Sequence, residues 1–383
     1  RRPLVVAGGG VLYSQAGATL AAWATAHGVP VAETQAGKGS VAWDHALNAG
    51  AVGVTGSPAA NALAAEADLV IAIGTRLQDF STASHTLWPK ARLLCLNVAP
   101  MDAAKWSGQA LVADARVVLA ALRPGAWRAA PEWTARATQL AAQWRERVAA
   151  LTTASLPAGE LPYEAEVIGA VRDSAEDSPR RDIAVCAAGT LPAELHKLWR
   201  TSTPGGYHVE YGYSCMGYEI AGALGVKMAR PDAEVIALVG DGSYLMMNSE
   251  IATSMMLKQK LIVVVLDNRG YGCIQRLQLA SGSPRFNNLL EDCGTPPAID
   301  FAANARSLGA QAVHVEDIAE LRSAMRAARA AKTTQVIVID TTPWRTTGDG
   351  GAWWEVAIPE ISPRAEVRSA RERYKTGKRG QRA

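Results

Sequence analysis

The sequence predicts an α/β protein with two doubly wound parallel-sheet domains, and three observations lead to that prediction. Short apolar runs rich in Val, Ile and Leu recur along the 383 residues, as is typical of parallel strands buried on both faces. Segments of helical composition alternate with these runs, which is the order of strand–helix–strand units. An Ala-, Arg- and Trp-rich stretch separates two such series. We therefore expect domains at 1–125 and 163–345, a helical connector at 126–162 and a tail at 346–383.

In the first series we expect a helix at 16–27 and strands at 4–7, 29–33, 68–74 and 92–97. Three glycines follow the first strand, but they lack the spaced third glycine of a dinucleotide-binding fingerprint. The sequence therefore gives no support for bound NAD or FAD, and we expect this domain to hold no cofactor.

In the second series we expect a helix near Pro192, another at 244–257, and strands at 183–187, 234–239, 261–266 and 335–340. The motif Gly-Asp-Gly-Ser at 240–243 follows one strand, and Asn268, 27 residues after Asp241, follows the next. A right-handed crossover brings both strand ends to the same edge of the sheet, where such sheets bind ligands. One carboxylate and one amide oxygen suit Mg²⁺, which would complete its octahedron with phosphate oxygens and water. The alternative is a turn aspartate with a helix-capping asparagine.

This pattern resembles the thiamin diphosphate fingerprint of the superfamily that includes acetohydroxyacid synthase and pyruvate decarboxylase. The resemblance implies that Mg²⁺ is bound by Asp241, Asn268 and the main-chain carbonyl of Gly270. It implies that Gly189 and Thr190 contact the cofactor, and that Gly242 and Ser243 hold its diphosphate from the other side. A glycine and a hydroxyl beside a helix N-terminus also suit an anion, with helix capping by Thr190 as the alternative.

The stretch 211–225 resembles the family segment that precedes the Gly-Asp-Gly strand. By that resemblance Met216 lies under the cofactor and bends it, and the carbonyl of Ser214 accepts from the pyrimidine amino group. A methionine at a helix start is otherwise core filler. A proton shuttle cannot be chosen among the polar residues near the motifs, because each could instead be a hydrogen-bonded residue with a structural role. These residues are His208, Glu210, Tyr211 and Tyr271.

Several stretches resemble one branch of the superfamily: 33–39, 74–79, 211–225, 267–275, 286–290 and the Trp353-Trp354 pair. That branch opens a cyclic 1,2-diketone, trihydroxycyclohexanedione, by hydrolysis to 5-deoxy-glucuronate in myo-inositol breakdown. The implied protein is a thiamin diphosphate- and Mg²⁺-dependent hydrolase of a C–C bond. The alternatives are an acetohydroxyacid synthase-like enzyme acting on 2-keto acids and an inactive cofactor-binding module.

No catalytic residue can be assigned, because the family's activating glutamate lies on an N-terminal domain. Residue 1 is Arg and stands directly before a strand-like run, so we expect a fragment that lacks that domain and is inactive alone. The family builds its site between subunits, which implies a homodimer or homotetramer at full length. The partner of the site is thus a small molecule, the cyclic diketone.

The composition bears on the cellular location of the protein and on the partners to expect. The five cysteines are scattered, which fits reduced thiols and a cytoplasmic protein. No apolar run approaches the roughly 18 residues of a membrane span, so no membrane partner is expected.

The C-terminal tail is basic: from Ile361 onward it contains eight Lys or Arg and two Glu, but no nucleic-acid-reading motif accompanies them. We expect a solvated helix with a frayed end and no nucleic-acid partner. The Trp353-Trp354 pair is expected to cover an active-site edge or a subunit contact.

Overall fold

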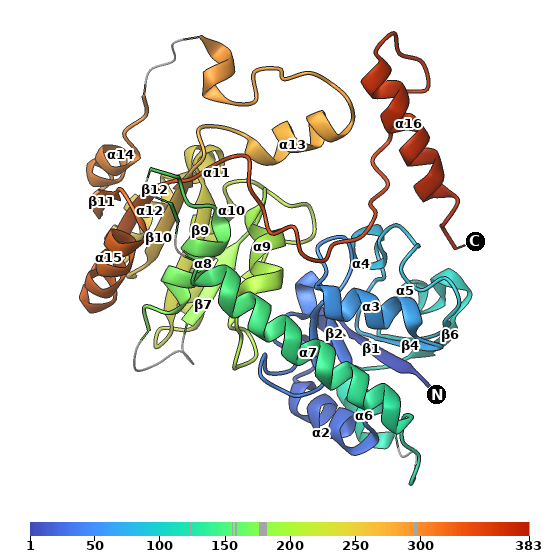
Figure 1. Ribbon diagram of the computed structural model, residues 1–383. Coiled ribbons are helices and arrows are strands. Elements are labelled where there is room, and N and C mark those ends of the chain that lie inside the picture. The colour runs from blue at the N-terminus through green and yellow to red at the C-terminus, as the bar shows by residue number, and fades with distance from the viewer. Residues whose placement is uncertain (123–124, 155, 158, 176–181, 295–297, 383) are drawn as a thin grey trace.

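The computed structural model describes residues 1–122, 125–154, 156–157, 159–175, 182–294 and 298–382. Two six-stranded sheets form two lobes, each with helices on both faces (Figure 1). All the strand pairs within these sheets are parallel. The predicted fold class is therefore confirmed.

The first sheet has the strand order β3-β2-β1-β4-β5-β6. Its strands are β1 (Pro3–Ala7), β2 (Val31–Glu33), β3 (Asn48–Ala51), β4 (Leu69–Ile73), β5 (Arg92–Asn97) and β6 (Gln109–Val112). Its helices are α1 (Gly9–Tyr13), α2 (Gly17–His27), α3 (Pro58–Glu66), α4 (Asp79–Thr82), α5 (Pro100–Ala104) and α6 (Ala115–Ala121). The sequence predicted the long apolar strands, whereas β3 and β6 lack an apolar run and were missed.

The second sheet has the order β11-β12-β10-β9-β7-β8. Its strands are β7 (Asp182–Cys186), β8 (Tyr207–Val209), β9 (Glu234–Gly240), β10 (Ile262–Asp267), β11 (Gln311–Val315) and β12 (Gln335–Asp340). Its helices are α8 (Glu164–Arg172), α9 (Leu191–Leu198), α10 (Tyr218–Ala229), α11 (Asp241–Met247), α12 (Glu250–Met256), α13 (Gly272–Ala280), α14 (Phe301–Ser307) and α15 (Ile318–Ala330). The helix expected at 244–257 is two helices, and the first begins at Asp241 itself.

The central strands of the second sheet are apolar throughout because both faces are buried. Successive residues of β9 and β10 alternate between two cores: Ile236 and Val264 belong to one, Val235 and Val263 to the other. This alternation is the period-2 geometry of a strand covered by helices on both sides.

One long helix lies along both lobes. The 22-residue α7 (Pro131–Thr152) packs against α3 and β3 of the first lobe and against α8 and α9 of the second (Figure 1). Trp133 and Trp144 are buried on its inner face, and the Trp133 indole donates to the carbonyl of Pro3 at 2.8 Å. The region expected to be a helical connector is therefore occupied by a helix that packs against both lobes.

Residues 33–39 contact the second lobe. The Lys38 ammonium donates to the carbonyl of His196 at 2.9 Å, and the Gln35 amide donates to the carbonyl of Pro192 at 2.9 Å. Burial lowers the pKa of His196 to about 3, so the ring is neutral and its Nε2 donates to the carbonyl of Glu33 at 2.9 Å. These buried bonds fix the two lobes against each other.

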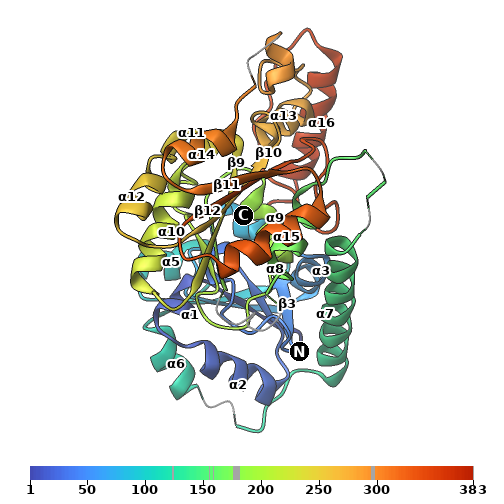
Figure 2. The same ribbon diagram turned by 90° about the vertical axis from the view of Figure 1, so that its left-hand side faces the viewer.

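The C-terminal region differs from the expected solvated helix with a frayed end. The helix exists as α16 (Ala365–Lys378), but Glu355 accepts from Tyr374, Lys378 and Gln381 at 2.6–2.8 Å. The main-chain N–H of Arg382 donates to the carbonyl of His85 at 2.9 Å. Figure 1 and Figure 2 show α13 and α16 toward the same end of the molecule, and Gly282, just after α13, packs against the main chain of Glu366 in α16. The end of the chain is thus attached to the first lobe. Among the described residues, none of the helices combines the length and apolarity that a membrane crossing requires.

Candidate active site

The register of β9 and β10 brings the predicted metal ligands together. Gly240 pairs with Leu266, so Asp241 and Asn268 leave the sheet at the same edge, one and two residues beyond that pair. Strand order reverses beside them, because β7 continues to β8 on one side while β9 continues to β10 on the other. Open α/β sheets bind ligands at such a switch point.

A cavity of about 250 Å³ occupies this edge of the sheet. Five segments line it: those that follow β7, β9 and β10, the one before α10, and the start of α8. All nine residues predicted from the sequence to bind metal or cofactor line this cavity: Gly189, Thr190, Ser214, Met216, Asp241, Gly242, Ser243, Asn268 and Gly270. Their roles are predictions, but their convergence in one space is a property of the structure.

Two buried oxygens in this cavity lack a partner within the described part of the chain. Asp241 accepts from the N–H of Gly270 through Oδ2 at 2.7 Å, whereas its Oδ1 makes no hydrogen bond. The side-chain oxygen of Asn268 is likewise buried without a partner. Buried acceptors are normally satisfied, so these two atoms indicate a ligand. One carboxylate and one amide oxygen fit Mg²⁺ that carries phosphate oxygens and water.

The surroundings of Asp241 destabilise the ionised form of its carboxyl group when no ligand is bound. Burial, with a contribution from the nearby carboxylate of Asp267, raises the pKa of Asp241 to about 7. A cation would reverse that shift, because it stabilises the ionised form. Within the described ranges no three His, Cys, Asp or Glu side chains group into a metal site. A metal here would therefore need ligand oxygens from another molecule.

Gly189, Gly242 and Thr190 form part of the wall of this cavity. Gly189 has a φ of +78°, and a Cβ at Gly242 would lie 2.7 Å from the ring of Tyr271. Glycine is thus required at both positions, by conformation at the first and by packing at the second. The hydroxyl of Thr190 does not cap α9; it accepts from the guanidinium of Arg276. The capping alternative is therefore not supported.

Ser243 and Glu219 hold three segments of the site together. The hydroxyl of Ser243 donates to the Glu219 carboxylate at 2.8 Å and accepts from the N–H of Gly217 at 2.9 Å. Glu219 also accepts from the N–H of Gly217 at 2.9 Å and from that of Ala188 at 3.4 Å. Glu219 could not be predicted from the sequence, because its partners come from three separate loops and no local pattern reveals them. The Ser243 hydroxyl is thus committed to protein, which leaves its main chain for a ligand.

Ser214 and Met216 enter the cavity from the segment before α10. Ser214 has a φ of +55°, and its hydroxyl donates to the carbonyl of Ala187 at 3.2 Å. Met216 is half-buried and lines the same cavity as Asp241 and Asn268. A left-handed backbone at a serine is strained, and such strain is found where a loop must present a group to a ligand.

The polar residues considered as proton shuttles mostly have structural partners. His208 pairs with the hydroxyl of Tyr218 at 2.6 Å, and Tyr211 pairs with that of Tyr13 at 3.1 Å. Burial would raise the pKa of Glu210, but backbone N–H donors from residues 212, 213 and 215 lower it. Tyr271 lies over Gly242 and lines the cavity. None of the four is thereby identified as the shuttle.

The cysteines beside the motifs are not poised as nucleophiles. All five cysteines are free, and burial raises the pKa of both Cys215 and Cys273. A thiol with a raised pKa is a poor nucleophile at neutral pH.

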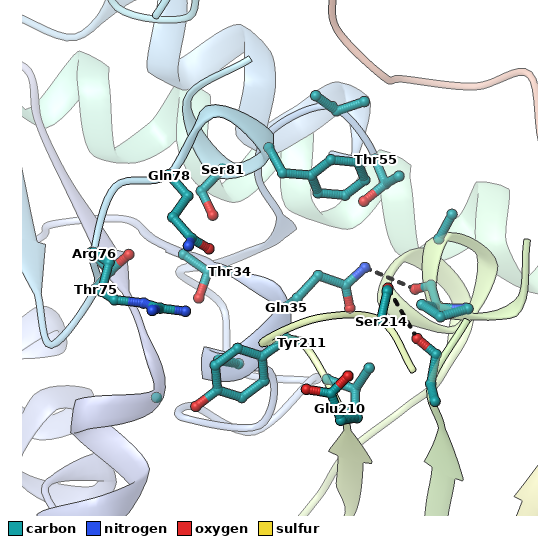
Figure 3. Close-up of a pocket in the computed structure, with 18 of the residues that line it drawn as sticks. Thr34, Gln35, Thr55, Thr75, Arg76, Gln78, Ser81, Glu210, Tyr211 and Ser214 are labelled. Carbon is teal, nitrogen blue, oxygen red and sulfur yellow. Dashed lines mark hydrogen bonds between the residues drawn. The ribbon is translucent and has the colours of Figure 1, made fainter. Parts of the chain in front are cut away.

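A second, larger cavity of about 1160 Å³ lies between the lobes and shares Gly189, Thr190, Ser214 and Cys273 with the first. Figure 3 shows Arg76 and Gln78 of the first lobe facing the same space as Tyr211 of the second. Trp354 also lines it and donates to Asp79 at 3.1 Å. Small molecules could thus reach the smaller cavity through this space.

Comparison with known proteins agrees with this geometry. Residues 187–341 match the thiamine pyrophosphate enzyme C-terminal TPP binding domain, and residues 1–122 match the thiamine pyrophosphate enzyme central domain. Similar curated proteins include three named 3D-(3,5/4)-trihydroxycyclohexane-1,2-dione hydrolase. That of Bacillus subtilis (strain 168) is 36% identical, that of Geobacillus thermodenitrificans (strain NG80-2) 37% and that of Halalkalibacterium halodurans 38%.

Each of these alignments covers 97% of this chain and 62% of the relative, so the chain spans less than two thirds of the proteins it matches. Apart from Glu164, the residues that line the cavity at the edge of the second sheet lie within the matched TPP binding domain, as do both buried oxygens without a partner. The chain therefore belongs to the thiamin diphosphate-dependent enzyme family, of which it carries the central and the cofactor-binding domains.

Proposed function

We propose that this chain binds thiamin diphosphate together with Mg²⁺ in the smaller cavity. The observation that carries the proposal is the pair of buried, unpartnered oxygens on Asp241 and Asn268 in one space. In the proposed complex these two side chains and the carbonyl of Gly270 hold Mg²⁺. The N–H groups near Gly189 and Gly242 face the diphosphate at the starts of α9 and α11.

We further propose that the whole protein hydrolyses a C–C bond of the cyclic 1,2-diketone trihydroxycyclohexanedione, giving 5-deoxy-glucuronate in myo-inositol breakdown. The names of the similar proteins support this substrate. Thiamin diphosphate, when bound, supplies a carbanion that adds to a ketone and an electron sink for cleavage of the adjacent bond.

In that reaction the residues of this chain bind the cofactor and orient it. Met216 supports the cofactor rings, and Ser214 offers its carbonyl to the pyrimidine amino group. Glu219 fixes the loops that carry these contacts through its bonds to Ser243 and Gly217. The expected setting is the cytoplasm, which five free cysteines support. The expected assembly at full length is a homodimer or homotetramer.

Calorimetric titration of the chain with thiamin diphosphate, with and without Mg²⁺, tests the cofactor proposal. We expect binding only with the metal; no binding under either condition would refute it. For the reaction, the protein at the full length of its relatives is incubated with the diketone and the product mass is measured. A gain of one water supports the proposal. An unchanged diketone with consumption of pyruvate in a parallel sample would assign it to 2-keto acids instead.

A further inference from the structure

Glu164 is a buried acid that lines the smaller cavity and that neither the sequence motifs nor the proposed metal site uses. It is the first residue of α8, which runs antiparallel to the strands and begins at their carboxyl edge. Its side chain is 4% exposed and shares the wall of the cavity with Thr190 and Cys273. It thus faces the same space as residues expected to contact the diphosphate.

The Glu164 carboxyl group has an oxygen without a partner. Its Oε2 is buried and makes no hydrogen bond within the described part of the chain. Glu166, two residues later on the same helix, differs: it accepts from the N–H of Tyr163 at 2.9 Å and from Arg345 at 3.2 Å. The fold therefore satisfies one glutamate of this helix and leaves the other facing the cavity.

The charges around Glu164 favour its neutral form. Burial, followed by the neighbouring acids Glu194 and Glu166, raises its pKa to about 7. Arg276 is the opposing charge, but its guanidinium donates to Thr190 and to the carbonyl of Pro343. The thiol of Cys273 also lies near Glu164. A neutral carboxylic acid has an O–H donor, whereas a carboxylate has only acceptors.

We propose that Glu164 is protonated in the cofactor complex and donates a hydrogen bond from its carboxylic O–H to a phosphate oxygen of the bound diphosphate. This inference rests on the proposed function, because it assumes that a diphosphate occupies the cavity. An ionised Glu164 would instead place a negative charge against a phosphate. Above neutral pH the free protein therefore takes one proton from the buffer, onto Glu164, when the ligand binds.

The test is a calorimetric titration of the chain with thiamin diphosphate and Mg²⁺ at pH 6 and pH 8, in buffers of different ionisation enthalpy. The buffer dependence of the heat gives the number of protons taken up. Glu164→Gln keeps the shape and an N–H donor but cannot titrate. Glu194→Gln is the matched control, because Glu194 is equally buried but lines only the larger cavity. Proton changes at Asp241 and on the ligand are common to all three proteins.

At pH 8 we expect the wild type to take up about one proton more than Glu164→Gln, and at pH 6 about the same number. Above pH 7 the wild-type affinity should fall about tenfold per pH unit relative to Glu164→Gln. Glu194→Gln should still take up the proton, with the midpoint moved to lower pH, because one charge that raises the pKa of Glu164 is gone.

Two results would overturn the inference: equal proton uptake by wild type and Glu164→Gln at pH 8, or loss of binding by Glu164→Gln at both pH values. The second would mean that an ionised Glu164 is needed. Should Glu164→Gln fail to fold, Glu164→Met, similar in volume and unable to titrate, gives the same proton comparison. Failure of the wild type to bind at either pH would instead refute the proposed function, and this inference with it.

Discussion

The two sheets of this protein have the same architecture but different chemistry at their carboxyl edges. Each has six parallel strands and one point at which the strand order reverses, between β1 and β4 in the first and between β7 and β9 in the second. Both edges face a cavity. By fold alone, either could hold a ligand.

The difference lies in which polar groups are satisfied by the protein. At the first edge, Asn97 donates to the carbonyl of Thr75 at 3.1 Å and accepts from the N–H of Ala99 at 3.0 Å. At the second edge, Oδ1 of Asp241 and the side-chain oxygen of Asn268 are buried and have no partner within the described part of the chain. The fold thus provides a crevice in both places, whereas buried groups that need an external partner distinguish the second.

The largest effect that this comparison predicts is at Asp241. Asp241→Asn keeps the shape but removes the charge, so the affinity for thiamin diphosphate and Mg²⁺ should fall by at least about 100-fold. Asp241→Ala should abolish Mg²⁺-dependent retention altogether. Asn97→Ala is the matched change at the first edge and should leave the affinity unchanged. Calorimetry measures all three, and equal losses at both edges would break the comparison.

Asp241→Asn should also stabilise the ligand-free protein. Burial raises the pKa of Asp241 from 3.8 to about 7, so the folded state holds this proton more tightly than the unfolded chain does. The stability of the wild type should therefore fall as the pH rises through that window, and Asp241→Asn should lack this loss. We expect a gain on the order of 1–3 kcal/mol at pH 8, measured by urea unfolding without ligand. A less stable variant would contradict this expectation.

A second, smaller effect is expected at Glu219, which organises the second edge without facing the metal. Glu219→Ala leaves Ser243 and the N–H of Gly217 with fewer partners, so it should destabilise the protein by roughly 2–4 kcal/mol. Cofactor affinity should fall about tenfold, because the loops that carry Gly189 and Gly242 lose their common anchor. Glu219→Gln, which retains one acceptor, should recover part of both losses. Unaltered unfolding of Glu219→Ala would contradict this role.

The parts of the fold that the sequence predicted are those with strong local patterns. β9, β10 and β12 are apolar because both faces are buried, and their bounds agree with the prediction to within one or two residues. β8 was missed because it has only three residues, and β11 because this edge strand is mostly exposed and has mixed composition. The break between α11 and α12 was also missed, since Asn and Ser in a helical stretch are compatible with either outcome.

The candidate site was predictable where residues are close in sequence to a strand end. Asp241 and Asn268 follow adjacent parallel strands, so their convergence follows from topology alone. Glu164 and Glu219 could not be found in that way, because their place in the site depends on how helices from other parts of the chain pack. The docking of α16 through Glu355 was missed for the same reason: a charged helix gives no sign of its partner.

A third effect, smaller again, is expected at Met216. Met216→Ala removes apolar contact with the cofactor but no metal ligand, so affinity should fall about 5–30-fold while the requirement for Mg²⁺ remains. In the protein at full length, hydrogen–deuterium exchange at the thiazolium C2 should also slow, because the rings lose their support. Met216→Leu, which restores apolar volume, is the control. An unaltered exchange rate in Met216→Ala would refute the supporting role.

The smallest effect is expected at Arg76, which follows β4 at the first edge and faces the larger cavity (Figure 3). Its side chain is exposed, so Arg76→Gln should change the stability by no more than about 0.5 kcal/mol. It lies on the first lobe and does not line the smaller cavity, so the affinity for thiamin diphosphate and Mg²⁺ should stay within about twofold of the wild type. If the diketone approaches through the larger cavity, the same variant of the full-length protein should raise KM and leave kcat unchanged. A clear loss of cofactor affinity would show that a cation at the first edge contributes to the diphosphate site, and the two edges would then form one site.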